Sequence, residues 1–147
     1  MRYLEENKEK IIDTPGGNLC QVFGKNENAS CSIALVKMNE NSKGVYHYHD
    51  NITEIYVFSK GKGTITINGN VNEINSGYCY IIPPKNGHLI ISETEMEFEC
   101  ICTPPWEEEH EFILEENTLI SNLKVNKQDT YGKINDIQEN IYYDNYY

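Results

Sequence analysis

One stretch decides the fold: Gly44-Val-Tyr-His-Tyr-His-Asp-Asn-Ile-Thr-Glu54. His47 and His49 are residues i and i+2, so on a β-strand both imidazoles project from the same face. Glu54 follows His49 by five positions, which is the wrong parity for that face if the strand runs straight. A turn or bulge must therefore intervene, and Asp50-Asn51 is the pair whose side chains favour one. The stretch predicts two strands whose polar side chains meet at one site.

A second stretch, Pro83-Pro-Lys-Asn-Gly-His88, brings another histidine to the same region. His88 follows a turn-forming loop and is expected on a neighbouring strand. Three neutral imidazoles and one carboxylate suit one divalent transition metal ion (Fe, Mn, Co, Ni, Cu or Zn), with water or substrate filling the open positions. The fourth histidine of the chain, His110, lies in the acidic run Glu107–Glu111 and is interpreted as a surface residue.

Short alternating or apolar runs closed by Gly, Asn, Asp or Pro repeat along the chain, and this pattern is typical of an all-β domain. The turns Lys60-Gly-Lys-Gly63 and Asn68-Gly-Asn70 offer the positive φ angles that tight hairpins need. Short strands at this spacing favour a sandwich or a barrel. The expected strands are 19–23, 31–38, 45–49, 53–59, 63–68, 71–75, 78–82, 88–92 and 95–103.

Composition excludes several classes of partner. The formal net charge is −11 and the pI is about 4.7, which opposes binding to nucleic acid and to anionic lipid. No stretch approaches the roughly 18 apolar residues of a membrane span, and the charged N-terminus lacks a signal-peptide core. Five cysteines without a CxxC pair fit reduced, buried thiols. These features predict a cytoplasmic protein whose partner is a small molecule.

The order and spacing of these residues resemble the two signature motifs of the cupin superfamily, here within residues 44–61 and 77–92. The resemblance covers about residues 30–106 and is nearest to small single-domain bacterial cupins of the cupin 2 type. It implies a conical β-barrel of jelly-roll type. It also implies that the protein ligands of the metal are His47, His49, Glu54 and His88.

Three positions depart from the cupin pattern. The first motif usually has glycine six residues before its first histidine, where this chain has Asn41. The second motif usually has glycine two residues after its proline, where this chain has Lys85. Its terminal asparagine is replaced by Ser92. None of these changes removes a ligand, but they alter the loops that shape a pocket.

The domain organisation is expected to be simple. Residues 1–116 are predicted to form one cupin-like barrel domain that ends in a short helix over 107–114, with acidic residues at its N-terminal end. Residues 117–147 are an acidic Tyr/Asn-rich extension, expected to pack on the barrel or on a partner subunit. A homodimer is predicted, because cupins of this type pair through sheet edges and terminal arms.

Two classes of function fit the sequence. The strings Glu54-Ile-Tyr56 and Thr103-Pro-Pro-Trp106 look most like cupins grouped with sugar and sugar-phosphate isomerases. That similarity implies a metalloenzyme acting on a small oxygen-rich metabolite by isomerisation or epimerisation, with a metal-dependent dioxygenase as the alternative. The other class is a non-catalytic module that binds a small ligand or a metal. Tyr56 and Tyr80 are candidate catalytic residues, as hydroxyls that orient substrate or move a proton, with barrel packing as the alternative.

The sequence leaves the role of one further pair of residues open. The period-2 pattern of 93–102 places Cys100 and Cys102 on the same face as Met96 and Phe98, opposite three glutamates. The cysteines are therefore interpreted as core residues. A redox role or a role as extra metal ligands is the alternative.

Overall fold

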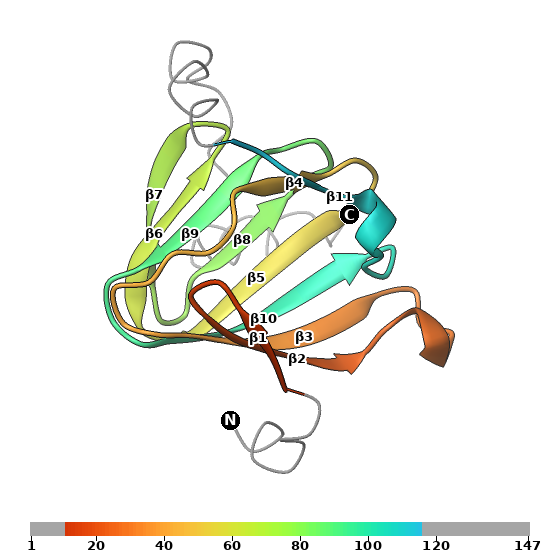
Figure 1. Ribbon diagram of the computed structural model, residues 1–147, viewed down its shortest axis with the longest axis horizontal. Coiled ribbons are helices and arrows are strands. Elements are labelled where there is room, and N and C mark those ends of the chain that lie inside the picture. The colour runs from red at the N-terminus through yellow and green to blue at the C-terminus, as the bar shows by residue number, and fades with distance from the viewer. Residues whose placement is uncertain (1–10, 116–147) are drawn as a thin grey trace, which may run out of the picture.

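The computed structural model describes residues 11–115, which form two antiparallel β-sheets that curve around a common interior (Figure 1). Within these residues, two short 3₁₀ turns, Lys25–Glu27 (η2) and Glu108–His110 (η3), accompany the strands. The six-stranded sheet has the order β1 (Ile11–Thr14), β2 (Gly17–Phe23), β3 (Ser32–Met38), β10 (Met96–Thr103), β5 (Thr53–Lys60), β8 (Cys79–Ile82). The five-stranded sheet has the order β11 (Glu111–Ile113), β4 (His47–His49), β9 (His88–Ser92), β6 (Lys62–Ile67), β7 (Asn70–Asn75).

Side-chain alternation builds the core of the barrel. Along β5, Glu54, Tyr56 and Phe58 point inward and are at most 5% exposed, while their neighbours in the sequence are more accessible. Phe98 on β10 lies opposite Phe58 in the β5–β10 register, with ring centroids 4.9 Å apart. Burial of each such aromatic ring contributes about 1.5–3 kcal/mol to folding. The apolar half of the barrel is therefore a packed core, and the polar inward residues lie beyond it along the same strands.

The nine strands expected from the sequence all form, with ends that shift by one or two residues. Gly61, with φ of 94°, turns the chain between β5 and β6. Asn68 and Gly69 both have positive φ in the two-residue hairpin between β6 and β7, as the Asn-Gly pair predicts. The all-β, barrel-type fold class is confirmed.

The prediction of a helix over residues 107–114 is wrong. Only Glu108–His110 makes a 3₁₀ turn, and Glu111–Ile113 continues as strand β11. Strand β11 pairs with β4 along its open edge, and Phe112 stacks on Tyr48 at a centroid distance of 5.1 Å. Backbone pairing and ring stacking with a distant strand outweigh the weak local preference of an acidic run for a helix N-terminus.

The departures from the cupin pattern keep the backbone that the pattern requires. Asn41 has φ of 52° and Lys85 has φ of 66°, so both adopt the left-handed conformation at positions where the motif usually has glycine. Ser92 is 2% exposed, and its hydroxyl donates to the carbonyl of Asn39 (2.6 Å) and accepts from the N–H of Ser42 (2.9 Å). The altered residues therefore hold the 39–42 loop and the loop before β9.

Across residues 11–115, none of the helical segments is long and apolar enough to cross a membrane. The predicted extension over 117–147 lies outside the described residues. The domain boundary at 116 and the packing of the extension stay predictions.

Candidate metal centre and cavity

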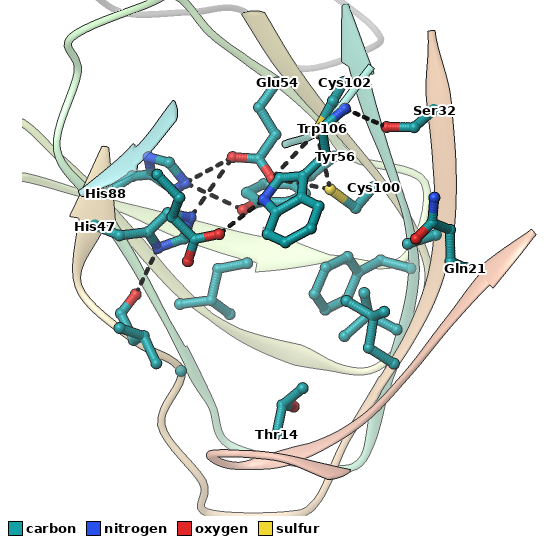
Figure 2. Close-up of a pocket in the computed structure, with 18 of the residues that line it drawn as sticks. Thr14, Gln21, Ser32, His47, Glu54, Tyr56, His88, Cys100, Cys102 and Trp106 are labelled. Atoms are coloured by element: carbon teal, nitrogen blue, oxygen red, sulfur yellow. Dashed lines mark hydrogen bonds and ion pairs between the residues drawn. The ribbon is translucent and has the colours of Figure 1, made fainter. Parts of the chain in front are cut away.

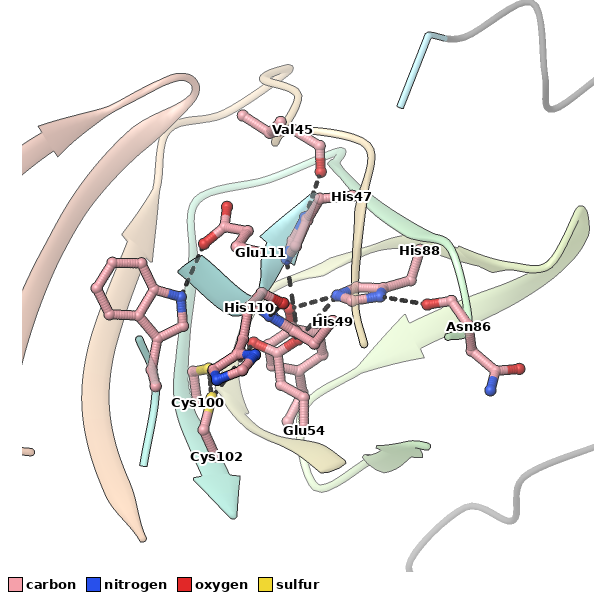
Figure 3. Close-up of polar contacts among 12 residues, drawn as sticks. Val45, His47, His49, Glu54, Asn86, His88, Cys100, Cys102, His110 and Glu111 are labelled. Carbon is pink, nitrogen blue, oxygen red and sulfur yellow. Dashed lines mark hydrogen bonds and ion pairs between the residues drawn. The ribbon is translucent and has the colours of Figure 1, made fainter. Parts of the chain in front are cut away.

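Four polar side chains from both sheets converge in the barrel. His47 and His49 come from β4 and His88 from β9, which are neighbours in the five-stranded sheet and pair His47 with His88. Glu54 comes from β5 in the opposite sheet. The bend at Asp50-Asn51 carries the chain from one sheet to the other, which resolves the parity mismatch between His49 and Glu54. Figure 3 shows the four side chains facing one another.

Glu54 Oε2 is the point on which the imidazoles converge. The distance from this oxygen to His88 Nε2 is 2.8 Å, to His49 Nε2 3.3 Å and to His47 Nε2 3.9 Å. Two ligand atoms that share an ion at about 2.1 Å lie roughly 3.0–3.4 Å apart at right or tetrahedral angles. The three distances from Glu54 Oε2 to the imidazole nitrogens, 2.8–3.9 Å, span that range.

The opposite ring nitrogen of each imidazole contacts a backbone carbonyl. His47 Nδ1 lies 2.9 Å from Val45 O, His88 Nδ1 lies 3.0 Å from Asn86 O, and His49 Nδ1 lies 3.3 Å from His110 O. Because a carbonyl only accepts hydrogen bonds, each Nδ1 carries a proton. In the neutral ring the lone pair is then on Nε2, so all three lone pairs point toward Glu54. This is how proteins fix the tautomer of metal-binding histidines.

Two buried atoms at the centre lack hydrogen-bond partners. His49 Nε2 and Glu54 Oε2 are both without one among the described residues. An unpaired polar atom in the interior costs about 1–3 kcal/mol. A cation at this point would satisfy the carboxylate oxygen and the imidazole lone pairs together. His47, His49, His88 and Glu54 therefore fit a divalent metal ion as a donor set.

The charges around the centre favour the metal-binding forms of Glu54 and His47, but not that of His49. Burial opposes the charged carboxylate, but the hydrogen bonds that a protonated Nε2 of His49 or His88 donates outweigh burial and hold the pKa of Glu54 well below its ordinary value. Burial, assisted by the neighbouring His88, lowers the pKa of His47. For His49 burial acts the same way, but Glu54 outweighs it and raises the pKa of that imidazole. An ionised Glu54 beside a neutral His47 is ready to bind a cation.

Tyr56 places a hydroxyl beside the centre. Its oxygen lies 3.1 Å from His88 Nε2, and the side chain is 5% exposed. Burial, reinforced by the negative charge of Glu54, raises the pKa of Tyr56 well above its ordinary value. The phenol therefore keeps its proton across the physiological range.

Tyr80, the other tyrosine singled out in the sequence, points elsewhere. Its hydroxyl donates to the backbone carbonyl of Glu73, and it does not line the cavity at the centre. The structure thus brings Tyr56, but not Tyr80, to the candidate site. His110 lies near the surface as expected, with Nδ1 2.9 Å from Asp50 Oδ1.

The centre opens into a cavity of about 350 Å³ (Figure 2). Its walls are mostly apolar side chains of β1, β2, β3, β9 and β10, including Leu19, Val36, Ile90 and Phe98. The described residues that line it include no lysine and no arginine, and its acidic members are Glu54 and Glu111. A cavity of this size accommodates a small metabolite.

Glu111 and Trp106 are cavity residues that the sequence interpretation missed. Glu111 lies beside His49 in the β11–β4 register and accepts a hydrogen bond of 2.7 Å from the Trp106 indole N–H. Both line the cavity. The β-favouring pair Phe112-Ile113, directly after the acidic run, was the available signal for a strand here.

Comparisons of sequence give a family. The family model described as ectoine synthase matches residues 6–117. An uncharacterized protein of Methanocaldococcus jannaschii is 33% identical over 86 residues, covering 57% of this chain and 69% of that protein. The L-ectoine synthase of Hahella chejuensis is 25% identical over 108 residues, covering 71% of this chain and 82% of that enzyme.

Comparisons of structure give the fold. The ectoine synthase of P. lautus superposes with a TM-score of 0.66 at 18% identity, covering 88% of this chain and 94% of that one. A cupin-2 domain protein of Rhodospirillum rubrum gives a TM-score of 0.62 at 12% identity, covering 75% and 73%. The cupin fold that the two motifs predicted is confirmed.

Proposed function

The chain belongs to the ectoine synthase family, and from this we propose that it is a metal-dependent enzyme that removes water from a small metabolite. Ectoine synthase is a cyclodehydratase, a lyase that closes a ring with loss of water. The observation that carries the proposal is the convergence of three imidazole Nε2 atoms on the unpaired Glu54 Oε2, beside a protonated tyrosine and at the end of a cavity. The isomerase and dioxygenase readings stay alternatives that the family does not favour.

The chain's own residues supply binding, orientation and a proton. A divalent ion held by His47, His49, His88 and Glu54 would act as a Lewis acid toward a substrate oxygen. Tyr56 Oη holds a proton next to the centre and can donate it to the departing oxygen. It regains a proton from the substrate atom that loses one as the new bond forms. The apolar walls exclude bulk water and favour dehydration.

Charge restricts the class of substrate. The described lining offers no lysine or arginine to a phosphate group, and Glu111 adds negative charge to the wall. A phosphorylated sugar would therefore find no cationic side chain on the described cavity wall. The lining supports a small substrate without phosphate, and the sugar-phosphate expectation finds no support there.

The reaction is tested in the reverse direction with L-ectoine, the compound in the name of the relative. Metal-loaded protein should convert it to a ring-opened product heavier by one water, followed by NMR and mass spectrometry. Tyr56→Phe, which removes only the hydroxyl, should lower the rate about 100-fold by loss of proton transfer. Tyr78→Phe is the matched control, because its hydroxyl contacts Glu73 outside the cavity. Binding of L-ectoine without ring opening would favour the non-catalytic alternative.

The ligand assignment is tested by metal content. His49→Ala and Glu54→Ala should each purify with markedly less metal than the wild type, because each deletes a donor to the ion. Elemental analysis of protein prepared without chelator measures this. Equal metal in wild type and both variants would refute the assignment.

We also propose a homodimer. Exposed apolar side chains on the two edge strands of the five-stranded sheet support it, since Val71 on β7 and Ile113 on β11 are each more than half exposed. Static light scattering of the full chain measures the mass, and a monomer at high concentration would refute the proposal.

A further inference from the structure

A second set of metal-binding side chains lies against the other oxygen of Glu54. In the β5–β10 register Cys102 pairs with Glu54 and Cys100 pairs with Tyr56. Paired residues of adjacent strands project from the same face of the sheet, and residues i and i+2 of one strand do so too. Both thiols therefore extend into the barrel beside Glu54, as Figures 2 and 3 show.

The distances group the two sulfur atoms with one oxygen. Cys100 Sγ lies 2.9 Å from Glu54 Oε1 and donates to it, and Cys102 Sγ lies 3.9 Å from the same oxygen. The two sulfur atoms are 3.9 Å apart. Two thiolates bound tetrahedrally to a zinc-like ion at about 2.3 Å lie roughly 3.8 Å apart. The sulfur–sulfur distance is therefore that of two ligands to one ion. The two sulfur–oxygen distances lie on either side of the roughly 3.5 Å expected for a thiolate and a carboxylate oxygen on that ion.

The two carboxylate oxygens of Glu54 face different kinds of metal-binding side chain. Oε2 faces the three imidazoles, and Oε1 faces the two thiols. Both cysteines line the cavity, so an ion can reach them from that side. Both are free thiols, and neither is needed for the donor set around Oε2.

We propose that Cys100 Sγ, Cys102 Sγ and Glu54 Oε1 form a second metal site, selective for a soft divalent ion of the zinc class. Thiolates select such ions over harder ones. Binding releases one proton from each thiol to solvent, and water completes the coordination. When both sites are filled, the Glu54 carboxylate bridges them. This site is separate from the imidazole site, and the proposal does not depend on the reaction proposed above.

A disulfide fits the geometry less well. Residues i and i+2 of an extended strand have Cα atoms about 6.8 Å apart, at the long limit for a disulfide. Packing of the two cysteines as plain core residues is the remaining alternative. A metal site, a disulfide and plain core packing each predict a different result when a thiophilic metal is added.

The test is a titration of chelator-treated, reduced full-length protein with Cd²⁺. The wild type should bind two equivalents, and one of them should produce the ultraviolet charge-transfer absorption of a cadmium thiolate. Cys100→Ser/Cys102→Ser should lose that absorption and one equivalent. The milder Cys102→Ser variant should weaken the thiol site about tenfold or more. Circular dichroism and thermal melting check that each variant is folded.

Two controls separate the sites. Cys31→Ser removes a cysteine that does not line the cavity, and it should keep both equivalents and the absorption. His47→Ala/His49→Ala should lose the other equivalent and keep the absorption.

A wild type without thiolate absorption, or absorption that survives in the double serine variant, would overturn the proposal. Loss of the absorption in the double alanine variant would also overturn it, because one ion would then be shared by both groups. Loss of turnover with retained absorption would concern only the imidazole site.

Discussion

Lys85 adopts a backbone conformation that is rare for lysine. Its φ of 66° is left-handed, and the side chain is exposed, so no side-chain burial depends on it. Strain of this kind costs a non-glycine residue about 1 kcal/mol or more, and glycine adopts it freely. Lys85→Gly should therefore raise the free energy of unfolding by up to about 1 kcal/mol, measured by urea denaturation. Asn41→Gly should gain less, since asparagine tolerates this region better. A loss of stability in Lys85→Gly would contradict the strain argument.

Ser92 is expected to matter through its hydroxyl alone. Ser92→Ala removes the acceptor of the part-buried N–H of Ser42 and one of the two donors to the carbonyl of Asn39, which keeps the Ser42 hydroxyl. The free energy of unfolding should fall by about 1 kcal/mol, the net contribution of a part-buried hydrogen bond. Ser76→Ala is the matched control, because its hydrogen bond to the carbonyl of Ser59 is exposed. Equal effects of the two substitutions in urea denaturation would refute this role of Ser92.

At the scale of elements, β11 supports the candidate metal centre without supplying a proposed ligand from its strand. It covers the edge of β4, and the segment before it contributes the His110 carbonyl that contacts His49 Nδ1. Phe112→Ala removes the ring that stacks on Tyr48, so β11 should pack less firmly and His49 should be less well oriented. Partners that orient a ligand are typically worth about 10–100-fold in metal affinity, and we expect about tenfold. Isothermal titration with the metal measures it.

The control for β11 is its other large apolar residue. Ile113 is 74% exposed, and Ile113→Ala should leave metal affinity close to that of the wild type. Equal losses in the two variants would mean that Phe112 acts only through general stability.

The contrast between β4 and β11 shows what the sequence could predict. The histidine pair, the Asp50-Asn51 turn and Glu54 lie within eleven residues, so local parity was enough to place them. Strand β11 exists because it pairs with β4, about sixty residues earlier in the chain. No local pattern reports that contact. The position of Cys102 beside Glu54 likewise depends on the β5–β10 register, which the sequence leaves undetermined.

At the scale of the molecule, the candidate metal centre joins the two sheets. Its imidazoles belong to the five-stranded sheet and its carboxylate to the six-stranded sheet. An ion that binds only the folded protein stabilises it, by about 2.7 kcal/mol at a free concentration one hundred times its Kd. A chelator should therefore lower the melting temperature of metal-loaded protein by several degrees, measured by scanning calorimetry. His49→Ala should show a much smaller shift, and a chelator shift of equal size in this variant would contradict the bridging role.

The three imidazoles are held by main-chain atoms, the carbonyls of Val45, Asn86 and His110. Every residue type carries a carbonyl, so substitutions at these three positions do not delete the acceptors. Homologous chains can therefore diverge at all three while the rings keep their orientation, provided that the backbone path is preserved. Substitutions among homologues should then occur at the positions of Val45, Asn86 and His110, while the four metal-binding residues stay unchanged. Aligned homologues would show that asymmetry.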